Sequence, residues 1–297
     1  MKILVTGSSG LVGSHLVPVL KDRGHNVVRL VRSFDQLSDD ALLWDPEHRE
    51  IDIEDFEGFD AVINLAGESI AGTWTPSKMR KIRDSRVLGT HMLSELFAKL
   101  SSPPKLFISA SAIGYYGDRG TEALEETSGP GKGFLAEVCK KWEAATLPLS
   151  NIGVRVVILR IGVVLSPDGG ALGKMLLPFK LGLGGVIGSG EQYLSWIAID
   201  DLVGIILYAL SNEKVKGFVN AVAPNAVTNR EFTKTLGQVL KRPTILPMPA
   251  FAARLMMGEM ANETVLSSEH VVPKSLENFG YHFLYPDLES SLRYLLG

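Results

Sequence analysis

The sequence predicts an α/β protein built on a doubly wound parallel sheet, with a smaller α+β lobe in its C-terminal half. Short β-branched runs alternate with apolar-periodic helical segments through the first half. The second half has shorter elements and is rich in glycine and proline. We expect the sheet domain to comprise residues 1–165 and about 198–222, and the lobe about 166–197 and 223–297.

The expected elements follow one another in order. Strands are expected at 3–6, 27–31, 41–44, 59–65, 105–109 and 154–161. Helices are expected after the first glycine turn and at 75–100, 134–145, 202–210, 230–240 and 288–296. Pro76 suits the first position of a helix. Asp200 and Asp201 are expected to cap the helix at 202–210 by accepting backbone N–H bonds.

Three glycines follow the first strand, at Gly7, Gly10 and Gly13. Gly7 would allow a tight turn, Gly10 a close approach of the backbone to a pyrophosphate, and Gly13 close packing of the next helix. The N-terminus of that helix would attract phosphate. Because a strand precedes the pattern and a helix follows it, the pattern indicates a Rossmann-like dinucleotide site.

The end of the second strand indicates which dinucleotide is bound. An acidic residue there would favour NAD, whereas the chain has Arg32-Ser33 and no acid before Asp35. A guanidinium can bind a 2′-phosphate through two parallel hydrogen bonds. The sequence therefore predicts NADP(H). The small pair Ala66-Gly67 would let the backbone pass close to the cofactor.

Composition and charge exclude several classes of function. The net charge of −3 gives no reason to expect nucleic acid or an anionic membrane as a partner. No apolar run is long enough to span a bilayer, and the N-terminus leads directly into a strand without room for a signal peptide. One cysteine permits no intrachain disulfide, and the six histidines lack metal-ligand spacing. We expect a cytoplasmic protein with a small-molecule substrate and no metal.

Several motifs together resemble the extended short-chain dehydrogenase/reductase superfamily. They are Thr6–Gly13, Asn64-Leu65-Ala66-Gly67, Ser85–Thr90, Ser109–Gly117 and Arg160–Leu165. More narrowly, the chain is similar to an atypical subgroup called epimerase family proteins, through Asn64–Glu68, Trp142–Ala145 and Gly182–Gly185. That subgroup usually has histidine where this chain has Ala198.

The resemblance implies a set of cofactor contacts. Arg32, Leu65, Ala66, Arg86 and Val164 are implied directly, and Lys81 is a further basic candidate for the adenine end. Leu11 and Val12 of the glycine turn, together with Ser33 and Gly67, complete the expected set.

The same resemblance shows that the usual catalytic pair is missing. Leu135 and Cys139 stand where the superfamily has its tyrosine and lysine, and only the serine remains, as Ser111. Tyr115, Tyr116 and Cys139 are candidate proton donors, Cys139 on the expectation that Arg86 lowers the pKa of its thiol. All three could instead be packing residues. The apolar residues 175–179 and Trp196 could line a substrate pocket or build the core of the lobe.

The leading functional expectation is an NADP(H)-dependent oxidoreductase acting on a small carbonyl or alcohol. The alternatives are a non-catalytic NADPH-binding or redox-sensing protein and a nucleotide-sugar epimerase. Pairing of two copies through the long helices, as in relatives of this fold, is possible.

Overall fold

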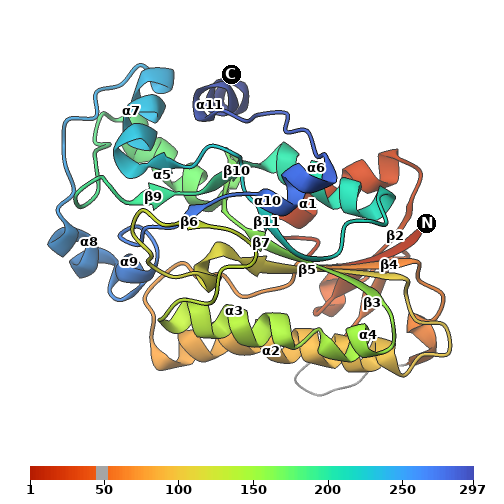
Figure 1. The fold of residues 1–297 in the computed structure, drawn as a ribbon. Helices are drawn as coiled ribbons and strands as arrows, with labels where there is room; N and C mark the ends of the chain where they lie inside the picture. Colours follow the sequence, from red (N-terminus) through yellow and green to blue (C-terminus); the bar gives the residue numbers. More distant parts are fainter. Residues whose placement is uncertain (45–52) are drawn as a thin grey trace.

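A parallel seven-stranded sheet forms the centre of the computed structural model, which describes residues 1–44 and 53–297 (Figure 1). The strand order is β11-β7-β5-β4-β1-β2-β3. The strands are β1 (Lys2–Thr6), β2 (Asn26–Val31), β3 (Ala41–Leu43), β4 (Ala61–Asn64), β5 (Leu106–Ala112), β7 (Arg155–Ile161) and β11 (Gly217–Ala221). The order reverses between β1 and β4, which opens a crevice at the carboxyl ends of these two strands.

The strands are mostly apolar because both faces of the sheet are covered. In β1, Ile3 and Val5 pack into one hydrophobic cluster and Leu4 into another, and all three are fully buried. One face carries α1 (Leu11–Asp22), α6 (Ile199–Ser211) and α10 (Lys274–Phe279), and the other α2 (Pro76–Ala98), α3 (Phe134–Ala144) and α4 (Leu147–Asn151) (Figure 1). The predicted doubly wound parallel sheet is confirmed.

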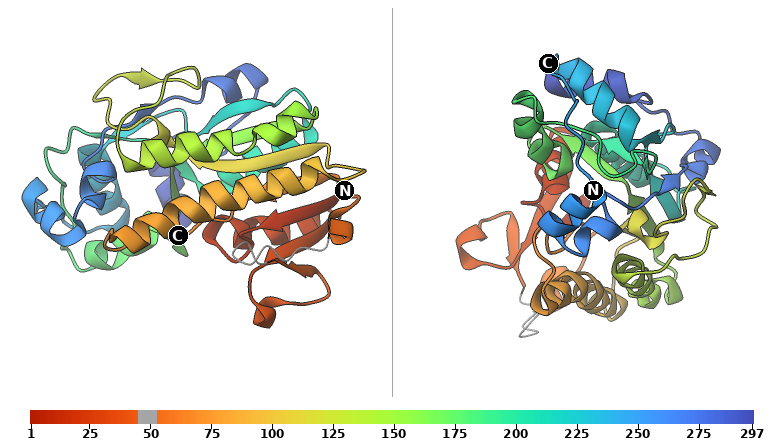
Figure 2. Two further views of the ribbon diagram at one scale, coloured as in Figure 1. Left: turned by 90° about the horizontal axis from the view of Figure 1, so that it is seen from below. Right: turned by 90° about the vertical axis from the view of Figure 1, so that its left-hand side faces the viewer.

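The long helix α2 begins where the sequence predicts. The hydroxyl of Thr75 accepts the N–H of Lys78, and Pro76 occupies the first helical position. In the left-hand view of Figure 2, α2 and α3 run side by side across the sheet. Short 3₁₀ turns occur at Phe34–Gln36, Ile53–Phe56 and Ile113–Tyr115.

The remaining elements form a smaller lobe beside the carboxyl ends of the strands (Figure 1). They are β6 (Ala123–Leu124), β8 (Val163–Ser166), α5 (Gly170–Lys180), β9 (Tyr193–Leu194), β10 (Trp196–Ala198), β12 (Val227–Thr228), α7 (Asn229–Leu240), α8 (Ala250–Met257), α9 (Met260–Glu263), β13 (His270–Val271) and α11 (Leu288–Leu296). Trp196 and Phe179 are buried in the core of this lobe, and Met175 and Leu176 pack against it. Leu177 instead lies 67% exposed. Most of these apolar residues therefore build the lobe rather than line a pocket.

The prediction that Asp200 and Asp201 cap α6 was wrong. The carboxylate of Asp201 is buried and accepts the backbone N–H groups of Leu284 (2.8 Å) and Tyr285 (2.9 Å), which precede α11. The helix begins at Ile199 with no side-chain cap. A buried carboxylate needs hydrogen-bond donors. Asp201 finds its donors in the C-terminal segment and so joins that segment to the sheet domain.

The other expected elements are present with shifts of a few residues, whereas the strand β11 was not predicted. No helix in the described ranges is long and apolar enough to cross a membrane.

Candidate cofactor site

A cavity of about 650 Å³ lies at the crevice between the carboxyl ends of β1, β2 and β4. Crevices of this kind are where open α/β sheets bind their ligands. Seven of the predicted cofactor residues line it: Gly7, Gly10, Arg32, Leu65, Ala66, Gly67 and Lys81. The structure therefore brings together residues that are up to 74 positions apart in the sequence.

The glycine turn has the geometry that a dinucleotide needs. Gly7 has φ +66°, and a Cβ on it would lie 2.7 Å from the backbone of Leu65. A Cβ on Gly13 would collide with the backbone of Gly7 and Ser8. The first N–H groups of α1 have no intrahelical partner and no side-chain cap at Gly10. This end of the helix is therefore a fit for a pyrophosphate.

A chain of buried hydrogen bonds holds the crevice in shape. The hydroxyl of Thr6 accepts N–H bonds from Leu65 and Ala66, both at 3.1 Å, and donates to Asn64 at 2.8 Å. Asn64 donates in turn to Thr90 on α2, which also accepts the indole N–H of Trp142 on α3. Sequence reasoning missed Thr6, Thr90 and the role of Trp142, because each acts through partners distant in the chain.

Three basic residues line the cavity. They are Arg32, which directly follows β2, and Arg80 and Lys81 of α2. Glu68 is held by Lys78 at 2.6 Å, and this hydrogen bond, with the charges of Lys81 and Arg32, keeps the pKa of Glu68 below its usual value. Asp84 is a second acid in the lining, so cations outnumber acids there.

The sequence carried a signal for Arg80 that was not used. The run Lys78-Met79-Arg80-Lys81 begins in the first turn of α2. Cations near a helix N-terminus oppose the helix dipole. Three cations within the first two turns of α2 therefore indicate that positive charge is needed here for a reason other than the stability of the helix.

Arg86 does not line the cavity but supports its floor. Its guanidinium donates to the carbonyl of Glu68 at 2.8 Å and lies over the ring of Trp142. It is also in contact with Gly67. Arg86 therefore positions the loop 66–68, and its predicted contact with the cofactor stays a prediction.

The other predicted residues lie around the cavity rather than in its lining. Leu11 and Val12 begin α1, and the side chain of Leu11 reaches Gly169 and Gly170 of the lobe. Val164 lies on β8, and Ser33 is exposed in the turn after β2 and hydrogen-bonds Asp35. Contact of these four residues with a cofactor stays a prediction.

Ser111 is held by a buried ion pair. Its hydroxyl donates to Oε1 of Glu143 at 2.8 Å, and Glu143 forms two hydrogen bonds of 2.9 Å with the guanidinium of Arg160. All three side chains are buried. The hydroxyl hydrogen of Ser111 is thus engaged in a hydrogen bond within the protein.

The structure corrects the candidacy of Tyr116 as a proton donor. Its side chain is fully buried, and its hydroxyl lies 2.7 Å from Oδ1 of Asn220 and accepts an N–H from Arg160. Burial raises the pKa of Tyr116 to about 12. Tyr116 is a packing residue in this structure.

Tyr115 differs from its neighbour. Its ring covers the guanidinium of Arg160 at 3.7 Å, while the side chain stays partly exposed. Its hydroxyl forms no hydrogen bond with any residue in the described ranges. The preceding residue, Gly114, packs against Leu135, which occupies the position of the superfamily's tyrosine.

Arg86 lowers the pKa of Cys139 as expected, but the expectation that the thiol therefore has a lowered pKa was wrong. Cys139 is buried, and burial together with the negative charge of Glu143 raises the pKa of its thiol to about 12. The opposing effect of Arg86 is smaller. The buried thiol is therefore a weaker acid than a free cysteine, and its role as a proton donor stays a prediction.

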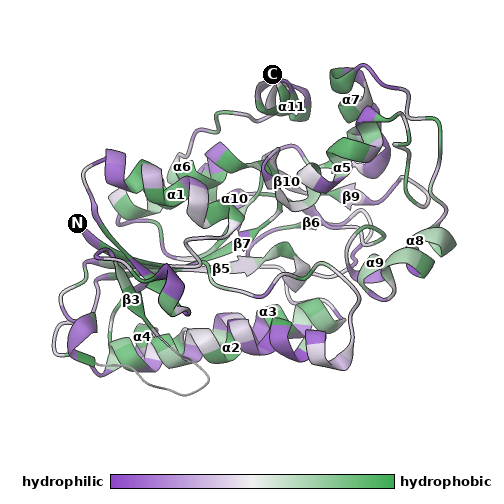
Figure 3. Ribbon diagram, turned by 180° about the vertical axis from the view of Figure 1, so that it is seen from behind, coloured by the Kyte–Doolittle hydropathy of each residue, from purple (hydrophilic) through white to green (hydrophobic). Residues whose placement is uncertain are grey.

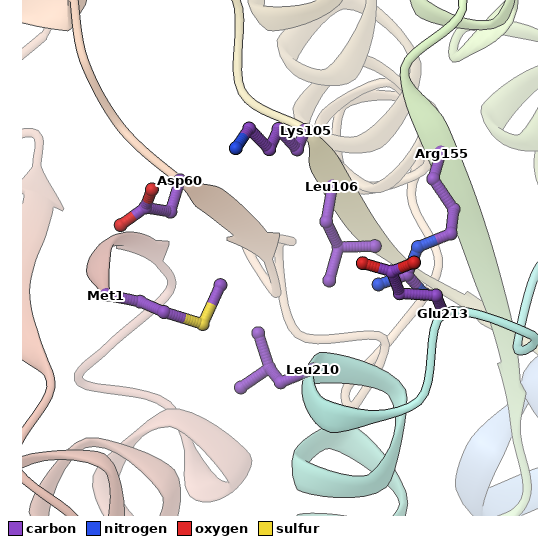
Figure 4. Close-up of a pocket in the computed structure, with 7 residues that line it drawn as sticks. All are labelled: Met1, Asp60, Lys105, Leu106, Arg155, Leu210 and Glu213. Carbon is purple, nitrogen blue, oxygen red and sulfur yellow. The ribbon is translucent and has the colours of Figure 1, made fainter.

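A second cavity lies at the opposite, amino edge of the sheet (Figure 4). It measures about 380 Å³ and includes Arg155 and Asp60 in its lining. Arg155 donates to the carbonyl of Val215 at 2.7 Å, and Asp60 accepts the backbone N–H of Lys2 at 2.7 Å. These polar groups are engaged in joining elements of the fold.

Comparison with known families agrees with the geometry of the first cavity. Residues 3–221 match the model of the NAD dependent epimerase/dehydratase family. The chain belongs to this family. Residues 248–295 match a C-terminal domain of unknown function. The resemblance inferred from the motifs is thereby confirmed.

Relatives of the family cover the chain almost completely. An epimerase family protein of Mycobacterium leprae is 39% identical over 98% of this chain and 94% of its own length. The solved structure of human epimerase family protein SDR39U1 (isoform 2) with NADPH has a TM-score of 0.91 and 34% identity, covering 99% of both chains. A nucleoside-diphosphate sugar epimerase from Corynebacterium glutamicum has a TM-score of 0.82 and 38% identity, and the match covers this whole chain and 58% of that one.

Proposed function

We propose that the protein binds NADP(H) in the cavity at β1, β2 and β4 and uses it as an oxidoreductase on a small carbonyl or alcohol. The observation that carries the proposal is that one cavity is lined both by the glycine turn and by the basic residues Arg32, Arg80 and Lys81. The solved human relative with NADPH supports it.

Different residues of the cavity would bind different parts of the cofactor. The uncapped N-terminus of α1 would bind the pyrophosphate, and Arg32 with Lys81 would bind the 2′-phosphate through charge-assisted hydrogen bonds. The loop 65–67, held by Thr6 and Arg86, would present backbone to the adenosine half. When bound, the nicotinamide supplies the hydride chemistry.

The proton must come from a residue other than the missing tyrosine. Of the predicted donors, Tyr115 keeps a hydroxyl that is not engaged by the described residues, next to the contact of Gly114 with Leu135. We assign Tyr115 as the proton donor. Ser111 donates to Glu143, so toward a substrate it would act as a hydrogen-bond acceptor only.

The test combines cofactor binding with turnover. The protein should quench or shift NADPH fluorescence on binding and should oxidise NADPH in equal molar amount to the carbonyl that it reduces, within a panel of small aldehydes and ketones. Tyr115→Phe should lower kcat while leaving the Kd for NADPH unchanged. The matched control is Tyr294→Phe, an exposed tyrosine on α11.

Other results would decide against the proposal. Tight NADPH binding without turnover across the panel would show a binding protein instead of an oxidoreductase. Interconversion of a nucleotide sugar with no net oxidation of cofactor would show an epimerase. We place the reaction in the cytoplasm, a reducing compartment that suits a chain with one cysteine.

A further inference from the structure

One end of the lobe exposes an unusual number of large hydrophobic side chains. Of the eighteen such side chains in the described ranges, eight lie in residues 177–183 and 245–256. They are Leu177, Leu181, Leu183, Ile245, Leu246, Phe251, Leu255 and Met256. Leu255 is 86% exposed and Phe251 71%. Scattered apolar residues on a surface need no explanation, but a concentration of them does.

These side chains come from two segments that lie against each other, and we call the exposed side of these segments the apolar end. The end of α5 is joined to the segment before α8 by Arg242, which donates to the carbonyl of Lys180 at 2.8 Å. Two backbone bonds of 2.8 Å, from Met248 to Val186 and from Gly188 to Met248, extend the junction. The right-hand view of Figure 2 faces this surface, and Figure 3 shows the hydrophobic colouring of α8.

The apolar end also carries an excess of positive charge. Residues 169–190 and 241–258 contain five basic residues and no aspartate or glutamate, although the whole chain has a net charge of −3. Three exposed acids border these ranges: Asp168 is paired with His15 and Glu191 with Arg230, which leaves Glu259. The five basic residues are Lys174, Lys180, Lys241, Arg242 and Arg254, and all are exposed. Within the part of the chain that the structure describes, none of them forms an ion pair.

We propose that the apolar end docks the protein on an anionic lipid membrane. Exposed aliphatic and aromatic side chains with unpaired cations among them match an acyl layer beneath anionic headgroups. The absence of a spanning helix does not conflict with this, since the protein would lie on the membrane. The net charge led us to expect no membrane partner, but the local charge of this surface has the opposite sign.

A second copy of the chain suits the surface less well. A two-fold interface places the same patch on both subunits, so the five cations would face each other. In addition, α8 projects at the extreme end of the molecule in Figure 1, so its exposed side chains can reach a flat layer.

The test is co-sedimentation of the whole protein with vesicles. Wild type should sediment with vesicles made of equal parts phosphatidylcholine and phosphatidylglycerol and should bind phosphatidylcholine vesicles at least about tenfold more weakly. The variant F251D/L255D should lose at least about tenfold in binding to the anionic vesicles. K174E/K180E should weaken anionic binding and leave the weak binding to neutral vesicles unchanged.

The matched control is Leu147→Asp on α4, a side chain that is 57% exposed and lies away from the apolar end. This variant should sediment like wild type. All variants should keep the wild-type circular dichroism spectrum. If the protein binds NADPH, they should also keep the wild-type affinity for it. A failure of NADPH binding therefore leaves the vesicle test intact.

Three results would overturn the proposal. The first is that wild type does not bind anionic vesicles. This result would overturn the proposal even if the apolar end bound an acidic protein. The second is equal binding of F251D/L255D and wild type. The third is a wild-type dimer that F251D/L255D converts to a monomer without any vesicle binding, which would assign the apolar end to contact between copies.

Discussion

The hydroxyl of Ser111 donates a 2.8 Å hydrogen bond to Glu143, whose carboxylate is itself paired with Arg160. The serine that the superfamily uses toward substrate is therefore part of a buried ion-pair network in this protein. Tyr116 belongs to the same network through Arg160. Two of the four predicted catalytic residues thus have structural partners that the sequence did not reveal.

Removing Glu143 should destabilise the fold strongly. Glu143→Gln would leave the guanidinium of Arg160 buried without a counter-charge, and breaking a buried pair in this way costs about 3–5 kcal/mol. Urea unfolding measures the loss. The double variant E143L/R160M should lose less than Glu143→Gln alone, because neither charge remains. The matched control Glu289→Gln removes an exposed ion pair with Arg293 and should cost about 1 kcal/mol or less. Equal losses for the two single variants would contradict this account.

Arg32 should discriminate between the two nicotinamide cofactors. Arg32→Ala removes the guanidinium from the cavity wall and should raise the Kd for NADPH at least about tenfold, since a hydrogen bond between charged groups is worth about 1.5–3 kcal/mol. The Kd for NADH should change little. Titration of cofactor fluorescence gives both constants. Lys216→Ala, an exposed cation away from the cavity, serves as control. An unchanged Kd for NADPH would remove Arg32 from the site.

Cys139 should be unreactive in the native protein. Because burial and Glu143 raise the pKa of its thiol to about 12, the thiol stays protonated at pH 8 and is shielded from reagents. Alkylation by iodoacetamide, followed by mass spectrometry, should be at least about 100-fold slower than in the urea-unfolded chain. The chain has one cysteine, so the signal is unambiguous. Rapid alkylation of the native protein would reopen the question of a catalytic thiol.

Asp40 should contribute a pH-dependent part of the stability. Hydrogen bonds from Lys21, Ser38 and Arg29 hold the pKa of Asp40 well below the unfolded value of about 3.9. Its contribution is therefore complete at neutral pH and is lost as the pH falls below about 4. The side chain is 34% exposed, so screening limits the effect of Asp40→Asn to about 1 kcal/mol at pH 7.

The exposed neighbour Asp39 provides the control for that experiment. Asp39→Asn should have no measurable effect on urea unfolding at either pH. The difference between Asp40→Asn and wild type should shrink steadily as the pH falls from 4 to 2. A difference that is the same at pH 7 and pH 2 would mean that Asp40 acts through packing rather than charge.

The parts of the fold that the sequence predicts are those with local causes. The strand β1 and the glycine turn follow from adjacent residues, and α2 begins at its own cap, Thr75. The strand β11 was not predicted because a polar residue, Asn220, occupies a buried position in it. Asn220 is paired with Val272 and lies near Tyr116, so its burial depends on the finished fold.

The cofactor cavity was also predicted in large part, because the glycines and Arg32 stand next to the strands that position them. The surroundings of the catalytic candidates were not predicted, because partners far away in the chain make them. Ser111 is 32 residues from Glu143, and Tyr116 is 104 residues from Asn220. The burial that raises the pKa of Cys139 is likewise a property of the packed structure.

The path of the chain has a consequence for how such proteins can diversify. The chain leaves the sheet after β7, forms β8, α5, β9 and β10 in the lobe, and returns through α6 to β11 before a second excursion into the lobe. Asp201 then ties that second excursion back to α6. A single recombination break cannot exchange the lobe without also exchanging the last strand of the sheet. Exchange of the whole lobe with the sheet kept intact therefore needs more than one break in the chain.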